Sequence, residues 1–375
     1  MPSSPNAGSQ VEPRALRAAN VVQLFQLAPD PRDPRGVRHP LRIVLTLAAA
    51  AVAAGARSFT AIAEHAWDAG PEILARVGLP GEIPSESTFR RVLEAVDPAV
   101  LSRLFGAWVG ARVATFGGQV AIALDGKTAR GAKNGPDGAP HLVAALEHTT
   151  GAVLGQLQVD AKTNEIPCAR ELLEMLDLDG VVVTMDAMHT QRETAELIVG
   201  RGGDYVLTVK DNQPALKESL ARLPWRDVPS RSYTERGHGR IVTRTVKALA
   251  KPAKVEFPGC EQVLQVRRAA TRKGKRTVEV VYLICSRPME DAQPLRVAQW
   301  VQGHWSIEVR LHYVRDVTFD EDRSQVRTGT GPAAMAVLRN IAITMLRLLG
   351  WDNIAAATRH HSRSPARVAK LLLTS

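Results

Sequence analysis

The sequence is poor in cysteine, and this scarcity narrows the classes of protein it can belong to. Among its 375 residues only three are cysteines, Cys168, Cys260 and Cys285, and no two of them have a C-x-x-C spacing. This argues against a disulfide-stabilised scaffold and against a cysteine-based zinc site. Unpaired cysteines also fit a reducing compartment, so we expect a cytoplasmic protein.

Long apolar runs are also missing. The longest, Ile43–Ala56, has fourteen residues, is rich in alanine and is interrupted by Thr46. It is too short and too weakly hydrophobic to span a bilayer, which takes about 20 residues. The segment Met1–Gln10 lacks the basic and then apolar pattern of a signal peptide. We therefore expect neither secretion nor a membrane partner.

Acidic residues are fewer than basic ones, 38 against 48, which gives a formal net charge of +10. Such a balance favours an anionic partner, and nucleic acid before any other. The excess is concentrated in one window: between Arg226 and Arg276, fourteen basic residues stand against four acidic ones, a surplus equal to that of the whole chain. We expect the anion-facing surface to lie in this window.

The first third of the chain is predicted to be helical. Residues 1–28 open with Ser, Pro, Gly and Asn and are expected to be flexible. Residues 29–117 contain four stretches with helical periodicity, which predicts an all-helical N-terminal domain. These stretches are 43–54, 58–67, 85–94 and 99–116.

The remainder alternates short apolar runs with amphipathic stretches, which is typical of a mixed α/β fold. We assign residues 118–213 and 295–350 to this α/β domain. Between its two parts, residues 214–294 predict a basic, β-rich insertion of three strands. Residues 351–375 form a basic C-terminal tail, which is expected to be loosely held from Arg359 onward.

Two aspartates stand at the ends of strand-like runs. Asp125 follows Val120–Leu124, and Asp186 follows Gly180–Met185. Ligands usually bind at such strand ends, and neighbouring carboxylates repel each other unless a cation joins them. Mg²⁺ prefers oxygen ligands, and two such ions can clamp a phosphoryl group during its transfer. For either residue alone, capping of a turn is the simpler interpretation, whereas the pair beside a basic insertion favours a metal site.

A third candidate carboxylate is Glu308. On a helix it shares one stripe with Leu311, His312, Arg315 and Asp316. A glutamate with histidine and arginine on its own face is unusual for a core stripe. Spacing alone leaves two interpretations open, a functional face and a solvated face stabilised by i,i+4 pairs.

Linked motifs along the chain carry a resemblance to a known family. They are Asp33-Pro-Arg-Gly-Val-Arg-His-Pro, Ser58-Phe-Thr-Ala-Ile-Ala-Glu, Asp125-Gly-Lys, Asp186-Ala-Met-His-Thr-Gln, Lys210-Asp-Asn-Gln-Pro, His304-Trp-Ser-Ile-Glu and His312-Tyr-Val-Arg-Asp-Val-Thr-Phe. In this order they resemble the DDE-type transposases of bacterial insertion sequences, in the group that includes the H-repeat-associated proteins. The resemblance covers about residues 30–350.

The resemblance implies the fold and the chemistry. The fold would be a ribonuclease H-like mixed-sheet catalytic core with a β-rich insertion, preceded by an all-helical domain that recognises DNA ends. Asp125, Asp186 and Glu308 would be the catalytic triad and would hold two Mg²⁺ ions, with Mn²⁺ as a substitute and no organic cofactor. The reaction would be cleavage and strand transfer at the ends of an insertion sequence, that is, DNA transposition and recombination.

The resemblance also implies partners. They would be double-stranded DNA, as terminal repeats and as target, and a second copy of the chain on that DNA, in the bacterial cytoplasm at the nucleoid. The residues expected to contact DNA are Lys127, Lys210, Asn212, Gln213, His304 and Arg315. Where the wider superfamily has Tyr, Arg and Lys around its catalytic glutamate, this chain has Val301, His304 and Arg315. Because Val301 lacks the hydroxyl group of that tyrosine, the resemblance does not imply that this chain forms hairpins at the DNA ends.

Two other functions remain open from the sequence. One is a ribonuclease H-like DNA nuclease without strand transfer, and terminal inverted repeats around the gene would count against it. The other is a catalytically silent DNA-binding descendant, against which the complete acidic triad argues.

Overall fold

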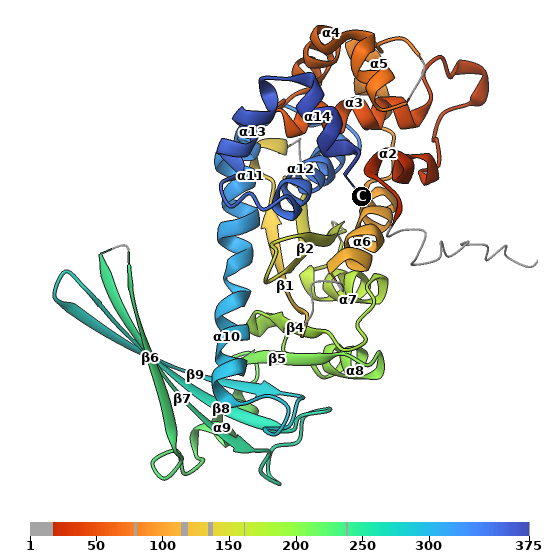
Figure 1. Cartoon of the computed structure of the whole chain (residues 1–375). Helices are drawn as coiled ribbons and strands as arrows, with labels where there is room; N and C mark the ends of the chain where they lie inside the picture. Colours follow the sequence, from red (N-terminus) through yellow and green to blue (C-terminus); the bar gives the residue numbers. More distant parts are fainter. Residues whose placement is uncertain are drawn as a thin grey trace, which may run out of the picture.

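A computed structural model of the chain describes most of its length. The described ranges are 18–78, 81–113, 119–133, 138–160, 162–237 and 239–374. They fold into a helical N-terminal region, a mixed α/β body and a sheet that protrudes from that body (Figure 1). Within these ranges we find no helix with the length and apolarity that crossing a bilayer requires.

One nine-stranded sheet runs through the molecule, in the order β3-β2-β1-β4-β5-β9-β8-β7-β6. Its first five strands are β1 (Ala121–Thr128), β2 (His141–Glu147), β3 (Val153–Gln158), β4 (Val182–Met185) and β5 (Asp204–Val209). β1, β4 and β5 are parallel neighbours, and β2 and β3 form an antiparallel hairpin on β1. This arrangement confirms the mixed-sheet, ribonuclease H-like core.

Continuous apolar runs explain why these strands lie at the centre of the body. All four residues of β4 are buried, as expected for a parallel strand covered on both faces. Helices α7 (Glu165–Met175) and α8 (Arg192–Gly200) pack against these strands, and α12 (Gly331–Leu348) is buried almost all round. The carboxyl ends of β1 and β4 are thereby fixed by a packed core.

The helical N-terminal region is confirmed. It contains α3 (Leu41–Ala53), α4 (Phe59–Arg76), α5 (Glu86–Leu93) and α6 (Pro98–Val113). α4 continues beyond the predicted end of its helix through a kink at Gly70, where φ is +63°. α6 lies directly on β3, and Gly106 makes this approach feasible, because a Cβ there would stand 1.9 Å from the carbonyl oxygen of Leu154.

Segments near both ends of the chain are folded where the sequence predicts flexibility. Val21–Leu24 form α2 and Phe25–Leu27 a 3-10 turn, with Val21, Leu24 and Phe25 buried, so this part of the predicted flexible segment is folded. Residues 1–17 lie outside the described ranges. The basic tail forms α13 (Ile354–Ser362) and α14 (Pro365–Leu372), which pack on α3, α4 and α12. The apolar face of α14, with Val368, Leu371 and Leu372 buried, holds the basic tail against the body.

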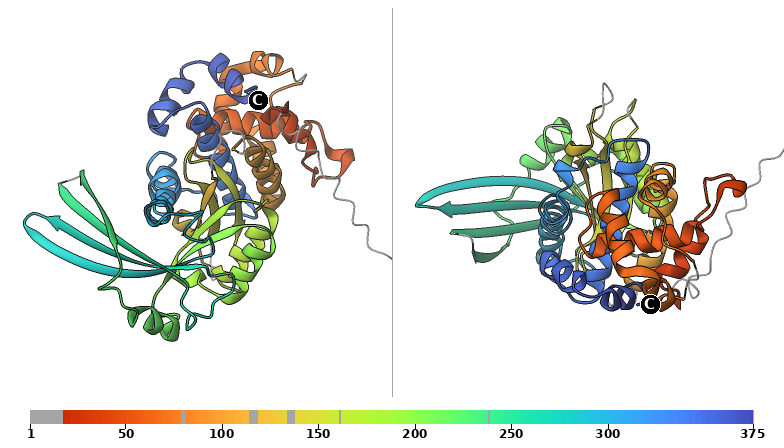
Figure 2. Two further views of the ribbon diagram at one scale, coloured as in Figure 1. Left: turned by 60° about the horizontal axis from the view of Figure 1, so that its bottom comes forward. Right: turned by 90° about the horizontal axis from the view of Figure 1, so that it is seen from above.

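The insertion has four long strands rather than three. They are β6 (Ser230–Gly237), β7 (Arg240–Ala250), β8 (Gln262–Arg272) and β9 (Lys275–Cys285), preceded by α9 (Pro214–Ala221). Their far ends protrude from the body as an arm (Figure 2). Because β9 pairs with β5, the arm continues the catalytic sheet and is not a separately linked module.

A long helical segment returns from the arm to the body. It begins with α10 (Pro294–His304), passes through a π-helical turn, η6 (Glu308–His312), and ends with α11 (Tyr313–Val317). Val297 and Trp300 of α10 are buried with Leu264 and Leu283 of the arm's base. The segment therefore runs from the base of the arm to the body (Figure 1). Glu308 lies in its π-helical turn.

Candidate active site

Two of the predicted acidic residues end neighbouring parallel strands. Leu124 of β1 is paired with Met185 of β4. The next residues along the two strands are Asp125 and Asp186, so both carboxylates leave the sheet at the same edge. This is the edge at which ligands bind in α/β sheets.

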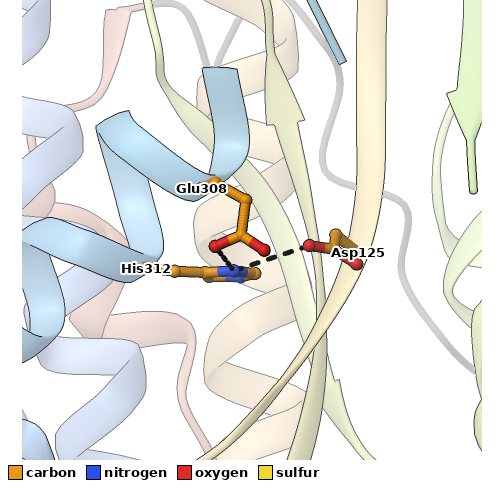
Figure 3. Close-up of side chains that lie close together, drawn as sticks. All are labelled: Asp125, Glu308 and His312. Atoms are coloured by element: carbon orange, nitrogen blue, oxygen red, sulfur yellow. Dashed lines mark ion pairs between the residues drawn. The ribbon is translucent and has the colours of Figure 1, made fainter. Parts of the chain in front are cut away.

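The third acidic residue reaches this edge from the long helical segment. Glu308 and His312 are four residues apart in the π-helical turn, and both face Asp125 (Figure 3). The His312 Nδ1 atom lies 3.5 Å from Glu308 Oε2 and 3.6 Å from Asp125 Oδ2. One donor atom from each of the three residues falls within 4.8 Å of the other two. The structure therefore brings Asp125 and Glu308 together from distant parts of the chain.

Asp186 lies beside this group rather than inside it. Its Oδ1 atom is 3.9 Å from the Nζ atom of Lys210, and both side chains are partly exposed. Its negative charge nevertheless reaches Asp125 and contributes to raising the pKa of that carboxyl. The charges of Asp186 and Glu308 therefore both act on Asp125.

The electrostatics of the group favour a bound cation. Burial, together with the charge of Glu308, raises the pKa of Asp125 to about 7. The hydrogen bond with His312 lowers the pKa of Glu308. A cation bound between these carboxylates would relieve their repulsion and would favour the ionised form of Asp125.

The donor set fits a divalent ion. Two carboxylates supply the hard oxygen ligands that Mg²⁺ and Mn²⁺ prefer, and the imidazole nitrogen of His312 lies close enough to be a third ligand. We therefore consider that Asp125, Glu308 and His312, with Asp186 at their side, are able to hold such an ion. Sequence reasoning placed His312 on the stripe of Glu308 but did not identify it as a ligand.

An arginine that the sequence analysis overlooked anchors the π-helical turn. Arg310 donates hydrogen bonds of 2.8–2.9 Å to the carbonyl oxygens of His148, Thr149 and Thr150, in the turn between β2 and β3. Charge-assisted bonds of this kind are stronger than neutral ones. Arg310 thereby fixes the helix that carries Glu308 against the sheet that carries Asp125.

A histidine–glutamate–histidine bridge supports the other side of Asp125. Glu165 of α7 lies 2.7 Å from His141 Nε2 on β2 and 2.9 Å from His189 Nε2, three residues after Asp186. Burial alone would raise the pKa of Glu165, but the two histidines outweigh it and lower this pKa to about 2. A Cβ on Gly126 would stand 2.3 Å from the Glu165 carboxylate, so a larger residue after Asp125 would have to displace that carboxylate from the bridge. The bridge ties α7, β2 and the loop after Asp186 together.

Two residues predicted to contact DNA hold that same loop. Asn212 Nδ2 donates to the carbonyl oxygen of Ala187 at 2.7 Å, and Gln213 Nε2 donates to that of Thr190 at 2.8 Å. Their side-chain amides are thus engaged with the backbone that follows Asp186. The structure gives them a positioning role.

Three other predicted DNA contacts have little surface exposed to solvent. Arg315 is fully buried against Glu321, with Arg315 Nη2 2.7 Å from Glu321 Oε1, so it presents no charge to solvent. The side chain of Lys127 is 9% exposed and lies 2.7 Å from Asp316. His304 is 7% exposed, and burial lowers its pKa, which disfavours the protonated form that would attract phosphate. Of the six residues, Lys210 retains a largely exposed charge at the site.

Comparisons with known proteins agree with this geometry. A family model described as "Transposase DDE domain" matches residues 116–345, and a "DDE_Tnp_1-associated" model matches residues 22–109. The site and fold therefore define a protein of the DDE transposase class, and the chain belongs to this family.

Relatives that align with most of the chain identify its group within the family. "Putative transposase YncI" of Escherichia coli O157:H7 is 32% identical over 345 residues, which cover 88% of this chain and 87% of the relative. "H repeat-associated putative transposase YhhI" of Escherichia coli K12 is 30% identical and covers 88% and 91%. "Putative protein YbfL" of the same strain is 31% identical with the same coverage. The resemblance to the group with the H-repeat-associated proteins is confirmed.

Proposed function

We propose that this chain cleaves double-stranded DNA at the ends of an insertion sequence and joins the freed 3′-hydroxyl to target DNA. The observation that supports this most directly is the meeting of Asp125 and Glu308, from opposite parts of the catalytic domain, at one buried histidine. Membership of the DDE transposase family agrees with it. The proposed substrate is double-stranded DNA, so we expect the protein to act at the nucleoid of a bacterial cell.

In this proposal Asp125, Asp186 and Glu308 hold two divalent ions, Mg²⁺ or Mn²⁺. When bound, these ions supply Lewis-acid activation of the attacking oxygen and charge stabilisation of the leaving oxygen in an in-line displacement. His312 keeps the Asp125 and Glu308 carboxylates facing each other, and Arg310 and Glu165 fix the elements that carry them. No covalent bond between enzyme and DNA is required.

DNA would be held by cations around this edge and by the arm. Lys210, half exposed and beside Asp186, is placed to contact a phosphate near the cut. The arm contributes sequence-independent contacts through its basic side chains. Residues 29–117 would recognise the terminal repeats, and two copies of the chain would pair the two DNA ends.

The chemistry is tested by cleavage of a duplex that carries the element's end, in Mg²⁺, with Asp125→Asn, Asp186→Asn and Glu308→Gln. Each variant should lose cleavage by at least a thousandfold while retaining DNA binding. Glu174→Gln, an exposed carboxylate on α7, is the matched control and should cleave normally. Normal cleavage by any of the three site variants would refute the assignment.

Strand transfer is tested separately, with a pre-cleaved end and a supercoiled target plasmid. A transposase joins the 3′-hydroxyl to the plasmid, and the same three variants lose this joining. If the protein cleaves the element's end but never joins it, the nuclease alternative is correct. If it binds DNA without cleaving it under any divalent ion, the silent descendant is correct.

A further inference from the structure

A basic pocket lies beyond the far end of β1, outside the group formed by Asp125 and Glu308. Its floor is made by two short turns, η3 (Arg130–Ala132) and η7 (Glu321–Arg323). Gly131 allows them to touch, because a Cβ there would stand 2.6 Å from the Glu321 carbonyl oxygen. Arg327 Nε donates to the Gly131 carbonyl oxygen at 3.1 Å and fastens the turns together. The pocket is therefore built by packed backbone.

The lining of this pocket is cationic. Its volume is about 510 Å³, and the side chains around it are those of Arg130, Gly131, Lys133, Asp322, Arg323, Gln325 and Arg327. The acidic member, Asp322, already lies 3.5 Å from Lys127. In the part of the chain that the structure describes, no carboxylate stands within ion-pair distance of Arg130 or Lys133, and both are exposed. Among the described residues, no carboxylate therefore balances the charges of Arg130 and Lys133, whereas Arg323 is paired with Asp320 at 2.7 Å.

The chemistry of the lining selects an anionic polymer over a small metabolite. Small-molecule sites are lined mainly by apolar and aromatic side chains. Apart from Gly131, every residue lining this pocket is polar or charged. Arginine forks and lysine ammonium groups match phosphate oxygens, and exposed positions allow a continuous backbone to pass.

The pocket is close to the catalytic edge and to the N-terminal region. Arg130 follows Asp125 by five residues, so their Cα atoms are at most about 17 Å apart along an extended chain. One strand of a duplex places a phosphate every ~3.4 Å of axis, so the pocket reaches a phosphate within about five nucleotides of the reacting bond. Arg57, between α3 and α4, donates to the Thr318 carbonyl oxygen at 2.9 Å and lies 3.4 Å from Asp320, next to η7.

We propose that this pocket binds a backbone phosphate of the element's DNA within about five nucleotides of the cleaved bond, between the catalytic carboxylates and the N-terminal region. This rests on the proposed function, because the ligand is the DNA that the site would cut. Arg130 and Lys133 are the principal contacts. Arg323 and Arg327 complete the positive rim.

The test compares two double variants of the full chain by anisotropy titration of a labelled end duplex in EDTA, at several salt concentrations. Arg130→Gln with Lys133→Gln removes the two exposed cations that are the principal contacts. Arg363→Gln with Lys370→Gln, exposed cations of the C-terminal helices, removes the same charge elsewhere. For the pocket variant, the slope of log K against log salt should be smaller in magnitude by about 1.8 than for the wild type. If both proteins bind equally at 1 M salt, the pocket variant then binds about 30-fold more weakly than the wild type at 0.15 M salt.

A second measurement ties the effect to a position on the DNA. Neutral methylphosphonates are placed one at a time at the five phosphates on either side of the cleaved bond. One of them should weaken binding by the wild type and by the control variant, but not by the pocket variant. Equal salt slopes for the two double variants, or no phosphate with this pattern, would overturn the proposal.

These outcomes are separable from those of the proposed function. If the wild type binds and cleaves the end duplex, and Asp125→Asn abolishes cleavage, the proposed function stands whatever the pocket variant does. If the wild type neither binds nor cleaves, the proposed function fails first. Both double variants replace exposed side chains, so unchanged melting temperatures will confirm that each is folded.

Discussion

Replacement of Glu321 by glutamine should destabilise the whole protein, because this carboxylate neutralises two buried arginines. Glu321 is 1% exposed. Its oxygens lie 2.7 Å from Arg315 Nη2 and 2.8 Å from Arg339 Nη1, and both arginines are themselves buried. Without the carboxylate, two guanidinium charges would remain in the core with no opposite charge.

The magnitude follows from two independent arguments. Burial alone would raise the pKa of Glu321, but Arg315 and Arg339 outweigh it and lower this pKa from 4.5 to about 2. At 1.36 kcal/mol per unit, the ionised carboxylate contributes about 3 kcal/mol to the free energy of unfolding. Removal of one partner from a buried ion pair costs ~3–5 kcal/mol in other proteins. We therefore expect a loss of ~3–5 kcal/mol at pH 7.

The sign of the pH dependence provides a second check. Because the folded pKa lies below the unfolded one, this contribution is complete above about pH 4.5 and disappears as the pH falls towards 2. Urea unfolding of the wild type and Glu321→Gln should therefore differ most above pH 5 and converge near pH 2. The control is Glu279→Gln, whose carboxylate is 59% exposed and 3.7 Å from Arg268, and it should cost less than ~1 kcal/mol. A Glu321→Gln effect no larger than the control's, or one that does not change between pH 5 and 2, would refute the reasoning.

Three further predictions concern the packing and the site. Gly106→Ala should destabilise the protein by ~3 kcal/mol, because its new Cβ would stand 1.9 Å from a carbonyl oxygen of β3. Gly110→Ala, one turn later, has nothing within 4 Å of its new Cβ and should be neutral or stabilising by up to ~1 kcal/mol. Urea unfolding measures both effects. Because Glu165 holds His141 and His189 beside the site, Glu165→Gln should raise the Mg²⁺ concentration for half-maximal cleavage by ~10-fold or more, with unchanged DNA affinity. The exposed control Glu174→Gln should leave this Mg²⁺ concentration unchanged. Equal Mg²⁺ profiles for the two variants would contradict the prediction. A carboxyl group binds a metal ion in its ionised form, and the pKa of Asp125 is about 7. Mg²⁺ should therefore raise the melting temperature more at pH 8 than at pH 6. Neither the wild type in EDTA nor Asp125→Asn should show this pH-dependent rise.

The catalytic strands were predictable because their residues are buried on both faces. Val182–Met185 and the apolar part of β1 are short continuous apolar runs that end in aspartate, and this pattern alone located Asp125 and Asp186. The arm was harder to predict. β6 is exposed along nearly its whole length, so it shows no alternation of apolar and polar residues, and it was missed.

The supports of the site could not be predicted from local pattern. Glu165 meets His141 and His189, each 24 residues away on a different element, and only the folded sheet brings them together. Arg315 was expected to contact DNA because it stands where the wider superfamily has a lysine after its catalytic glutamate. Its partner Glu321 belongs to an acidic stretch that looks solvated in sequence, and the structure buries both.

The continuity of the nine-stranded sheet has a mechanical consequence. β9 is hydrogen-bonded to β5 from Val206 to Val209, and the arm's base shares a buried cluster with α10. A rigid rotation of the arm relative to the body would break the hydrogen bonds between β5 and β9, at ~0.5–1.5 kcal/mol per bond, and would expose the buried cluster to water. The angle between the arm and the sheet edge that carries Asp125 and Asp186 is therefore set when the chain folds.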